Sequence, residues 1–318
     1  THYRPVTWDE ALDVVASELA GLGSPDEADA TAAIWGGGFV AQSSAMASIG
    51  PFWFVGLRFA IAAIAVLPFA LMETRSRKSP PRRREIGNFI FVGLALFAGA
   101  TTQQVGLLTT TVTNSSFLTG LYVIFVPVIA VILYRRHPHW IVWPCALMML
   151  GGIFLLSGGA FETLTKGDFL SIVCAFFWGI QITLAGRFVS ESGRPLALSC
   201  TQFAVCSLLS CMIGAVFEPL SFAAIEASLA EILYVGLVSS GLAFVLQVIG
   251  QRYTTAPQAA IFLSSEALFG ALLASVFLKE TISGAGYVGC LIIFAAILMV
   301  ELVPELTRKR PKPLTETT

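Results

Sequence analysis

Long apolar runs recur along this chain and limit what it can fold into. A membrane-spanning helix needs about 20 largely apolar residues, and the sequence contains ten such runs separated by short polar breaks. They lie near residues 29–47, 52–72, 87–107, 114–134, 140–158, 169–189, 197–217, 230–250, 257–278 and 285–303. The sequence therefore predicts an all-α integral membrane protein with ten transmembrane helices.

The composition excludes an ordinary soluble domain. Apolar residues make up 56% of the chain and charged residues 12%, against about 45–50% and about 25% in soluble domains. The formal net charge of −1 provides no overall basic field that would bind nucleic acid. All six cysteines fall in apolar runs without a CxxC pair. We therefore expect reduced core thiols and no metal site.

The positions of Lys and Arg predict the orientation, because cytoplasmic loops carry an excess of these residues. If the ten spans alternate across the membrane, 16 of the 19 basic residues fall on one side. Six of them lie in the break from Glu73 to Glu85, and four lie in the tail at 304–318. We expect a multi-pass protein of the cell (inner) membrane with both termini and this basic tail in the cytoplasm.

The two halves of the sequence match each other at a shift of 143 to 144 residues. Gln103 and Gly106 in the third span reappear as Gln247 and Gly250 in the eighth. Further matches pair Pro51, Phe59 and Ala60 with Pro195, Phe203 and Ala204, and Trp35 with Trp178. Because each repeat has an odd number of spans, the two must cross the membrane in opposite senses. We predict two inverted five-helix repeats, 28–158 and 168–303, an arrangement in which transporters bind substrates near the midplane.

Several motifs resemble a known family. They are the run Trp35-Gly-Gly-Gly-Phe39, the stretch from Gly50 to Phe59, and the stretch from Gln247 to Glu266. They are similar to the EamA-like family of the drug/metabolite transporter superfamily, and the likeness covers about residues 30–303. The resemblance implies a secondary transporter that moves a small metabolite, an amino acid or related compound, by alternating access, with efflux the commonest role. Ala267 departs from the family, which often has a helix-kinking proline there.

Residues 1–27 differ from the rest of the chain and are predicted to form a cytoplasmic leader. Residues 1–22 resemble a short segment of molybdopterin oxidoreductases such as formate dehydrogenase, but no cysteine precedes Cys145 to ligate the cluster of those enzymes. A foreign or mis-joined segment and an evolved cytoplasmic helix both fit this leader. The alternative function is a membrane subunit of such an oxidoreductase. It is disfavoured because every histidine lies outside the spans, so we expect neither enzymatic activity nor a cofactor.

Two ionisable residues inside the spans are functional candidates, because charges within a membrane are costly. Glu266 lies ten residues into the ninth span and Arg58 seven residues into the second. Glu266 can serve as a proton site, or it can stay protonated and hydrogen-bond Ser264, Ser265 or the backbone. Arg58 can bind a substrate carboxylate or phosphate through two hydrogen bonds, or it can extend to the headgroups or pair with Glu266.

Aromatic and amide side chains complete the predicted substrate pathway. Trp35 and Trp178 can stack on flat or cationic metabolites, although plain packing explains them equally well. The amides in the spans must mostly face the bundle interior, and they are Gln42, Gln103, Asn114, Gln181, Gln202 and Gln247. The predicted pathway comprises Trp35, Arg58, Gln103, Asn114, Trp178, Gln181, Gln247 and Glu266. The expected partners are a small metabolite and lipid, with protons and a second copy in a homodimer as open alternatives.

The orientation can be tested with single cysteines in a background that lacks the six native ones. One is placed within 73–85 and the other within 160–167. We expect a membrane-impermeant thiol reagent added to intact cells to label only the 160–167 site, because the basic 73–85 break faces the cytoplasm. Labelling of the 73–85 site from outside would contradict the predicted orientation.

Overall fold

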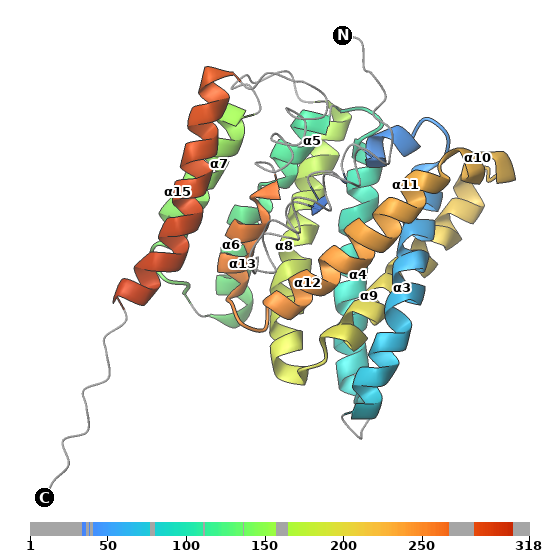
Figure 1. Ribbon diagram of the computed structural model, residues 1–318, viewed down its shortest axis with the longest axis horizontal. Helices are drawn as coiled ribbons and strands as arrows, with labels where there is room; N and C mark the ends of the chain where they lie inside the picture. Colours follow the sequence, from blue (N-terminus) through green and yellow to red (C-terminus); the bar gives the residue numbers. More distant parts are fainter. Residues whose placement is uncertain are drawn as a thin grey trace, which may run out of the picture.

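The computed structural model describes residues 34–35, 38, 41–76, 80–110, 112–135, 137–156, 165–266 and 283–307, and the regular structure within these ranges is helical (Figure 1). The first half contributes α3 (Pro51–Ser76), α4 (Arg83–Gly106), α5 (Val112–Thr119), α6 (Tyr122–Tyr134) and α7 (Val142–Leu156). The second half contributes α8 (Lys166–Ser192), α9 (Pro195–Phe217), α10 (Phe222–Ala227), α11 (Leu229–Tyr234), the π-helix η1 (Val235–Leu242), α12 (Ala243–Gly250), α13 (Ala256–Leu263) and α15 (Gly284–Thr307).

Seven helical stretches within the described ranges are long and apolar enough to cross a membrane. They correspond to predicted spans two, three, four, six, seven, eight and ten. The predicted fifth span is the shorter apolar helix α7, with 15 residues. The first and ninth spans lie partly outside the described residues. The chain is therefore an all-helical membrane protein, and the count of ten spans stays a prediction.

Two of the predicted spans are not uniform α-helices. The fourth is divided between α5 and α6 at Gly120 and Leu121. The eighth runs through α11, η1 and α12, and η1 is a π-helix of eight residues. A π-helix bonds residue i to i+5 and is often found at functional sites. Hydropathy cannot predict these changes, because it measures composition rather than hydrogen-bond pattern.

Helices α3 and α9 lie antiparallel, and a glutamate at the end of α9 caps the start of α3 (Figure 1). The Glu218 carboxylate accepts hydrogen bonds from the backbone N–H groups of Phe52 at 3.1 Å and Trp53 at 3.0 Å. The Trp53 indole Nε1 also donates to the Glu218 carbonyl at 3.1 Å. A carboxylate is favoured here because the first N–H groups of a helix lack internal partners and carry partial positive charge.

The other end of the pair repeats this arrangement with the roles exchanged. Glu73, in the last turns of α3, accepts hydrogen bonds from the backbone N–H groups of Leu196 at 3.3 Å and Ala197 at 3.0 Å, at the start of α9. A shift of 144 residues maps Phe52 onto Leu196 and Trp53 onto Ala197. The capped helix starts therefore fall at matching positions of the two sequence halves, and the capping glutamates, 145 residues apart, are one residue away from that shift. We call the two arrangements the reciprocal caps.

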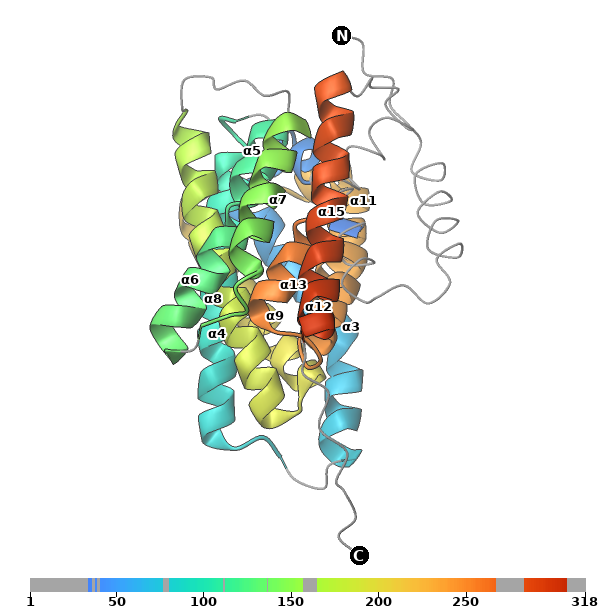
Figure 2. The same cartoon turned by 90° about the vertical axis from the view of Figure 1, so that its left-hand side faces the viewer.

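The core of the bundle lies where helices of both halves meet. Phe59 on α3 and Phe203 on α9 are fully buried and pack with ring centroids 5.7 Å apart. Helix α4 packs against α8 and α9. Helices α7 and α15 lie side by side, at the left edge of the bundle in Figure 1 and facing the viewer in Figure 2. Large apolar side chains cover the outside, including Ile64, Phe91 and Ile132, each at least 65% exposed. Such an apolar exterior suits a lipid environment.

Removing either cap is expected to destabilise the bundle. Glu218→Ala leaves the N–H groups at the start of α3 without partners, and Glu73→Ala does the same for α9. We expect each substitution to lower the free energy of unfolding by about 1 kcal/mol, the usual cost of losing a helix cap. Thermal unfolding in detergent measures the effect.

The matched control for the caps is Glu226→Ala, which removes an exposed carboxylate from α10. This variant is expected to unfold at the temperature of the parent protein. If Glu218→Ala and Glu73→Ala also unfolded at the parent temperature, the caps would not hold the two helices together.

Candidate functional site

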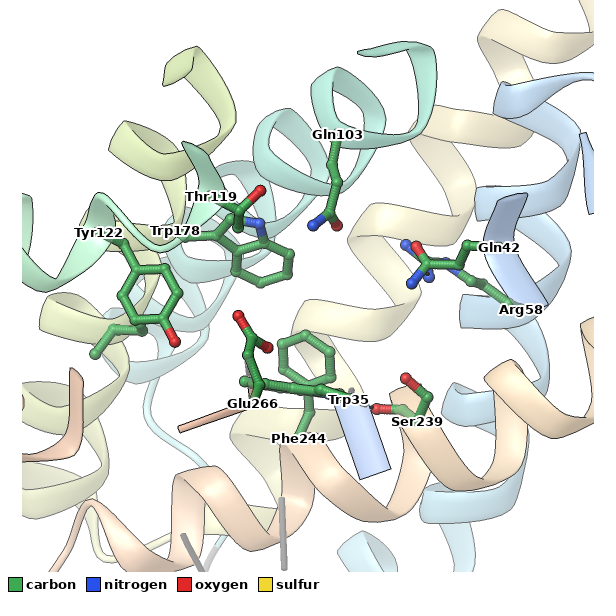
Figure 3. Close-up of a pocket in the computed structure, with 11 residues that line it drawn as sticks. Trp35, Gln42, Arg58, Gln103, Thr119, Tyr122, Trp178, Ser239, Phe244 and Glu266 are labelled. Atoms are coloured by element: carbon green, nitrogen blue, oxygen red, sulfur yellow. Dashed lines mark hydrogen bonds between the residues drawn. The ribbon is translucent and has the colours of Figure 1, made fainter. Parts of the chain in front are cut away.

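A cavity lies in the middle of the bundle, between helices of both halves (Figure 3). The first half lines it with Trp35, Gln42, Arg58, Gln103, Thr119 and Tyr122, and the second half with Trp178, Ile182, Ser239, Phe244 and Glu266. The space that water-sized spheres can occupy measures about 40 Å³, enough for a few water molecules. Sites for small molecules range from about 300 to 1,000 Å³, so the cavity is narrower in this conformation than a complete metabolite site.

Arg58 on α3 brings a positive charge to one side of the cavity. Its side chain is 4% exposed, and its Nη1 donates a hydrogen bond to the Gln42 amide oxygen at 2.8 Å. The guanidinium lies 4.9 Å from the ring centroid of Phe59 and 5.6 Å from that of Phe54. Its Nε has no hydrogen-bond partner among the described residues. Arg58 is therefore buried rather than extended to the headgroups, and it retains a donor for an anion.

Glu266 brings a carboxylate to the opposite side of the same cavity (Figure 3). It is 6% exposed. Among the described residues, no ion pair within 4.0 Å joins it to Arg58. Tyr122 places its hydroxyl on the same side of the cavity as Glu266. Arg58 and Glu266 therefore face one space without forming an ion pair.

The backbone departs from a regular helix just before Glu266. Helix α13 ends at Leu263, and Ser264 and Ser265 form a turn. Both serine hydroxyls donate to backbone carbonyls of this same segment, at 2.8 and 2.6 Å. The described hydrogen bonds of Ser264 and Ser265 therefore go to the backbone rather than to the carboxylate. The break forms although Ala267 stands where the family often has proline.

Aromatic rings line the part of the cavity wall that runs from Arg58 to Glu266. Phe244 on α12 stacks on Trp178 with ring centroids 5.4 Å apart and lies 4.7 Å from Trp35. The Trp35 indole Nε1 donates to the carbonyl oxygen of Ser239 at 2.9 Å, within η1. The wall therefore combines rings of both halves and presents flat apolar surface.

The predicted amides fall into different groups. Gln103 lines the cavity. Gln181 and Gln247 are bonded to each other instead, with Gln247 Nε2 donating to Gln181 Oε1 at 3.2 Å. Gln181 Nε2 donates in turn to Gln202 Oε1 at 3.1 Å. Asn114 belongs to α5, but its side chain lies outside the described part of the structure.

Six of the lining residues are missing from the predicted pathway. Gln42 was named only among the interior-facing amides, and sequence reasoning missed Thr119, Tyr122, Ile182, Ser239 and Phe244. Phe244 is one of 24 phenylalanines in the chain, and nothing in the sequence distinguishes it. Ser239 and Ser240 form a polar pair inside an apolar run. That pair was the one signal that could have drawn attention to this part of span eight.

Comparison with known proteins identifies the family. The profile of the EamA-like transporter family matches residues 29–158 and again residues 165–302. The chain belongs to the EamA-like transporter family. The resemblance found in the sequence motifs is therefore confirmed.

Two archaeal relatives support this assignment. An uncharacterized transporter of Archaeoglobus fulgidus is 30% identical over 271 residues, covering 85% of this chain and 83% of its own. An uncharacterized transporter of Methanothermobacter thermautotrophicus is 27% identical over 184 residues, covering 56% of this chain and 53% of its own. A protein of known crystal structure shares the fold at a TM-score of 0.72, over 89% of this chain and 98% of its own, at 19% identity.

The family membership decides between the functional classes considered from the sequence. This EamA-like protein is a membrane transporter and not an enzyme. Within the described ranges, no three His, Cys, Asp or Glu side chains lie together as metal ligands would. Residues 1–22, which alone suggested an oxidoreductase, lie outside those ranges, and their resemblance stays a prediction.

Proposed function

We propose that this protein is a secondary transporter of the cell membrane that exports a small metabolite. It works by alternating access of two inverted five-helix repeats, which together make ten spans with both termini in the cytoplasm. The observation that carries the proposal is the cavity, because both halves contribute to its walls. In transporters built from inverted repeats, the substrate site lies between the repeats near the midplane.

The packing of matching residues supports the inverted arrangement. The reciprocal caps join α3 and α9, which fall at matching positions of the two halves, in antiparallel orientation. Phe59 contacts Phe203, and Trp35 lies 6.4 Å from Trp178 between ring centroids. The two aromatic pairs are related by the shift of 143 to 144 residues. Contacts between matching residues are expected close to a two-fold axis that relates the repeats.

The charges of the cavity support an amino acid as the substrate. Arg58 suits a carboxylate, because arginine can bind both oxygens of such a group. Glu266 on the opposite side suits an ammonium group. The wall formed by Trp35, Trp178 and Phe244 suits an apolar or aromatic side chain. A zwitterion with such a side chain therefore matches all three parts of the cavity.

The role of Arg58 is tested by counterflow of radiolabelled L-phenylalanine in proteoliposomes. Arg58→Met keeps the length of the side chain but removes its charge. We expect the uptake rate to fall at least about tenfold, because a hydrogen bond to a charged group is lost. Arg58→Lys keeps the charge and is expected to retain part of the activity.

The matched control for Arg58 is Arg187→Met. Arg187 is an exposed arginine that pairs with Glu191 at 2.6 Å on the surface of α8. This variant is expected to transport like the parent. Counterflow at the parent rate in folded Arg58→Met would overturn the role assigned to Arg58.

We propose that Glu266 couples export to protons. Glu266→Gln is nearly isosteric with the protonated acid, so we expect the fold to survive, while the substrate binds more weakly because its ammonium group loses the carboxylate. Transport driven by an imposed proton gradient is expected to disappear, because the amide cannot release a proton. Proton-driven transport by Glu266→Gln at the parent rate would rule out coupling at this residue.

A further inference from the structure

Three buried glutamines form a hydrogen-bonded chain across three helices. Gln202 on α9 accepts from Gln181 on α8, which accepts from Gln247 on α12. The side chains are at most 2% exposed. We call these residues the amide chain. Two of its polar atoms, Gln202 Nε2 and Gln247 Oε1, have no hydrogen-bond partner among the described residues. The hydrogen-bonding capacity of the amide chain is therefore only partly used at both of its ends.

The amide chain occupies positions that match cavity residues of the other half. A shift of 144 residues maps Arg58 onto Gln202 and Gln103 onto Gln247. Arg58 and Gln202 are each the eighth residue of their helix, α3 and α9. Gln103 and Gln247 are each three residues before the end of theirs, α4 and α12. In an inverted arrangement, Arg58 and Gln103 lie toward the outer face, and Gln202 and Gln247 lie toward the cytoplasm.

The two sets of positions differ in packing. Arg58 and Gln103 face open space in the cavity. Gln202 and Gln247 are bonded through Gln181 in closed packing, and Gln251 Nε2 extends this closure by donating to the Ile182 carbonyl at 3.0 Å. Around them lies a buried apolar cluster of α4, α8, α9 and α12 that includes Phe89, Val92, Ala185, Val189, Leu198 and Val248. Among the described residues, one side of the bundle thus holds a cavity where the matching side holds packed side chains.

We propose that the amide chain is the cytoplasmic gate of the transporter. When the second half takes the conformation of the first, the hydrogen bonds of the amide chain break. Gln202 and Gln247 then line a cavity that is open to the cytoplasm. Their amides then bind the polar groups of an entering substrate. This inference rests on the proposed function. A partly satisfied polar network suits a gate, because breaking it costs less than breaking a fully paired one.

The gate is tested by accessibility, using Ile182→Cys as a reporter in a background without native cysteines. Ile182 lines the cavity, and its side chain is not part of the amide chain. In the parent, a membrane-impermeant thiol reagent should label the reporter from the outer side and only slowly from the cytoplasmic side of inverted vesicles. Gln202→Leu/Gln247→Leu leaves Gln181 without these two partners. We expect labelling from the cytoplasmic side to accelerate about tenfold, because an unpaired buried amide favours the hydrated, open state.

A matched control separates gating from general loss of a buried amide. Gln104 on α4 is fully buried and donates to the Gln42 carbonyl at 3.3 Å, outside the amide chain. Gln104→Leu should leave labelling from the cytoplasmic side at the slow parent rate. If Gln202→Leu/Gln247→Leu does not fold, Gln247→Leu alone carries the same test with a smaller acceleration.

A triple variant tests the opposite outcome. Gln181→Leu/Gln202→Leu/Gln247→Leu replaces all three glutamines of the amide chain with apolar side chains. This removes the unpaired amides that favour opening. We expect slow labelling from the cytoplasmic side and at least a tenfold loss of transport. Labelling of the double variant at the parent rate, or transport by the triple variant at the parent rate, would overturn the gate.

Failure of the gate is distinguishable from failure of the proposed function, because labelling needs no substrate. A parent protein that fails to transport L-phenylalanine, while the double variant still opens, contradicts the proposed substrate and supports the gate. A parent that transports normally, while the double variant stays closed, contradicts the gate and supports the proposed function.

Discussion

Two carboxylates determine how the halves of this transporter meet. Glu218 binds the first N–H groups of α3, and Glu73 binds those of α9. The first N–H groups of a helix lack internal partners and carry partial positive charge, so a carboxylate that binds them is stabilising. Satisfying both starts from the partner helix requires α3 and α9 to be antiparallel and of similar length. The caps thereby set the levels at which the side chains of the two helices face each other.

The cavity follows from that register. With α3 and α9 held at both ends, Phe59 meets Phe203 at the centre, and Arg58 lies next to this contact. A buried charge without an opposite charge is expensive. Arg58 has this cost, whereas a carboxyl group such as Glu266 can avoid it by binding a proton. We interpret the unpaired state as the resting condition of a binding site. A zwitterionic substrate supplies both missing partners at once and leaves again when the other side opens.

The sequence predicted the parts of this picture that depend on composition and repetition. Hydropathy located the seven membrane-capable helices of the described ranges, and the repeat singled out Trp35 and Trp178 before any contact was known. The cost of charges in lipid identified Arg58 and Glu266. The sequence did not predict features that depend on rotation about a helix axis or on pairing between residues far apart in the chain. A sequence does not say whether Gln247 turns toward a cavity or toward Gln181, and the structure joins the two.

The reciprocal caps escaped prediction for a related reason. Glu73 and Glu218 stand at the ends of apolar runs, where solvated acidic residues are common. Their partners lie 123 and 166 residues away in sequence. The π-helix η1 and the turn at Ser264 were equally hidden, because each changes the hydrogen-bond pattern of a segment without changing its hydropathy.

The central claim is that opposite charges across one cavity bind a zwitterion. Calorimetry with the purified protein tests it through three ligands: L-phenylalanine, L-phenylalaninamide, which lacks the carboxylate, and 3-phenylpropionate, which lacks the amine. The account predicts that each analogue binds at least about tenfold more weakly than phenylalanine, because one buried charge of the protein stays unpaired in each complex. Equal affinity for all three ligands would contradict it.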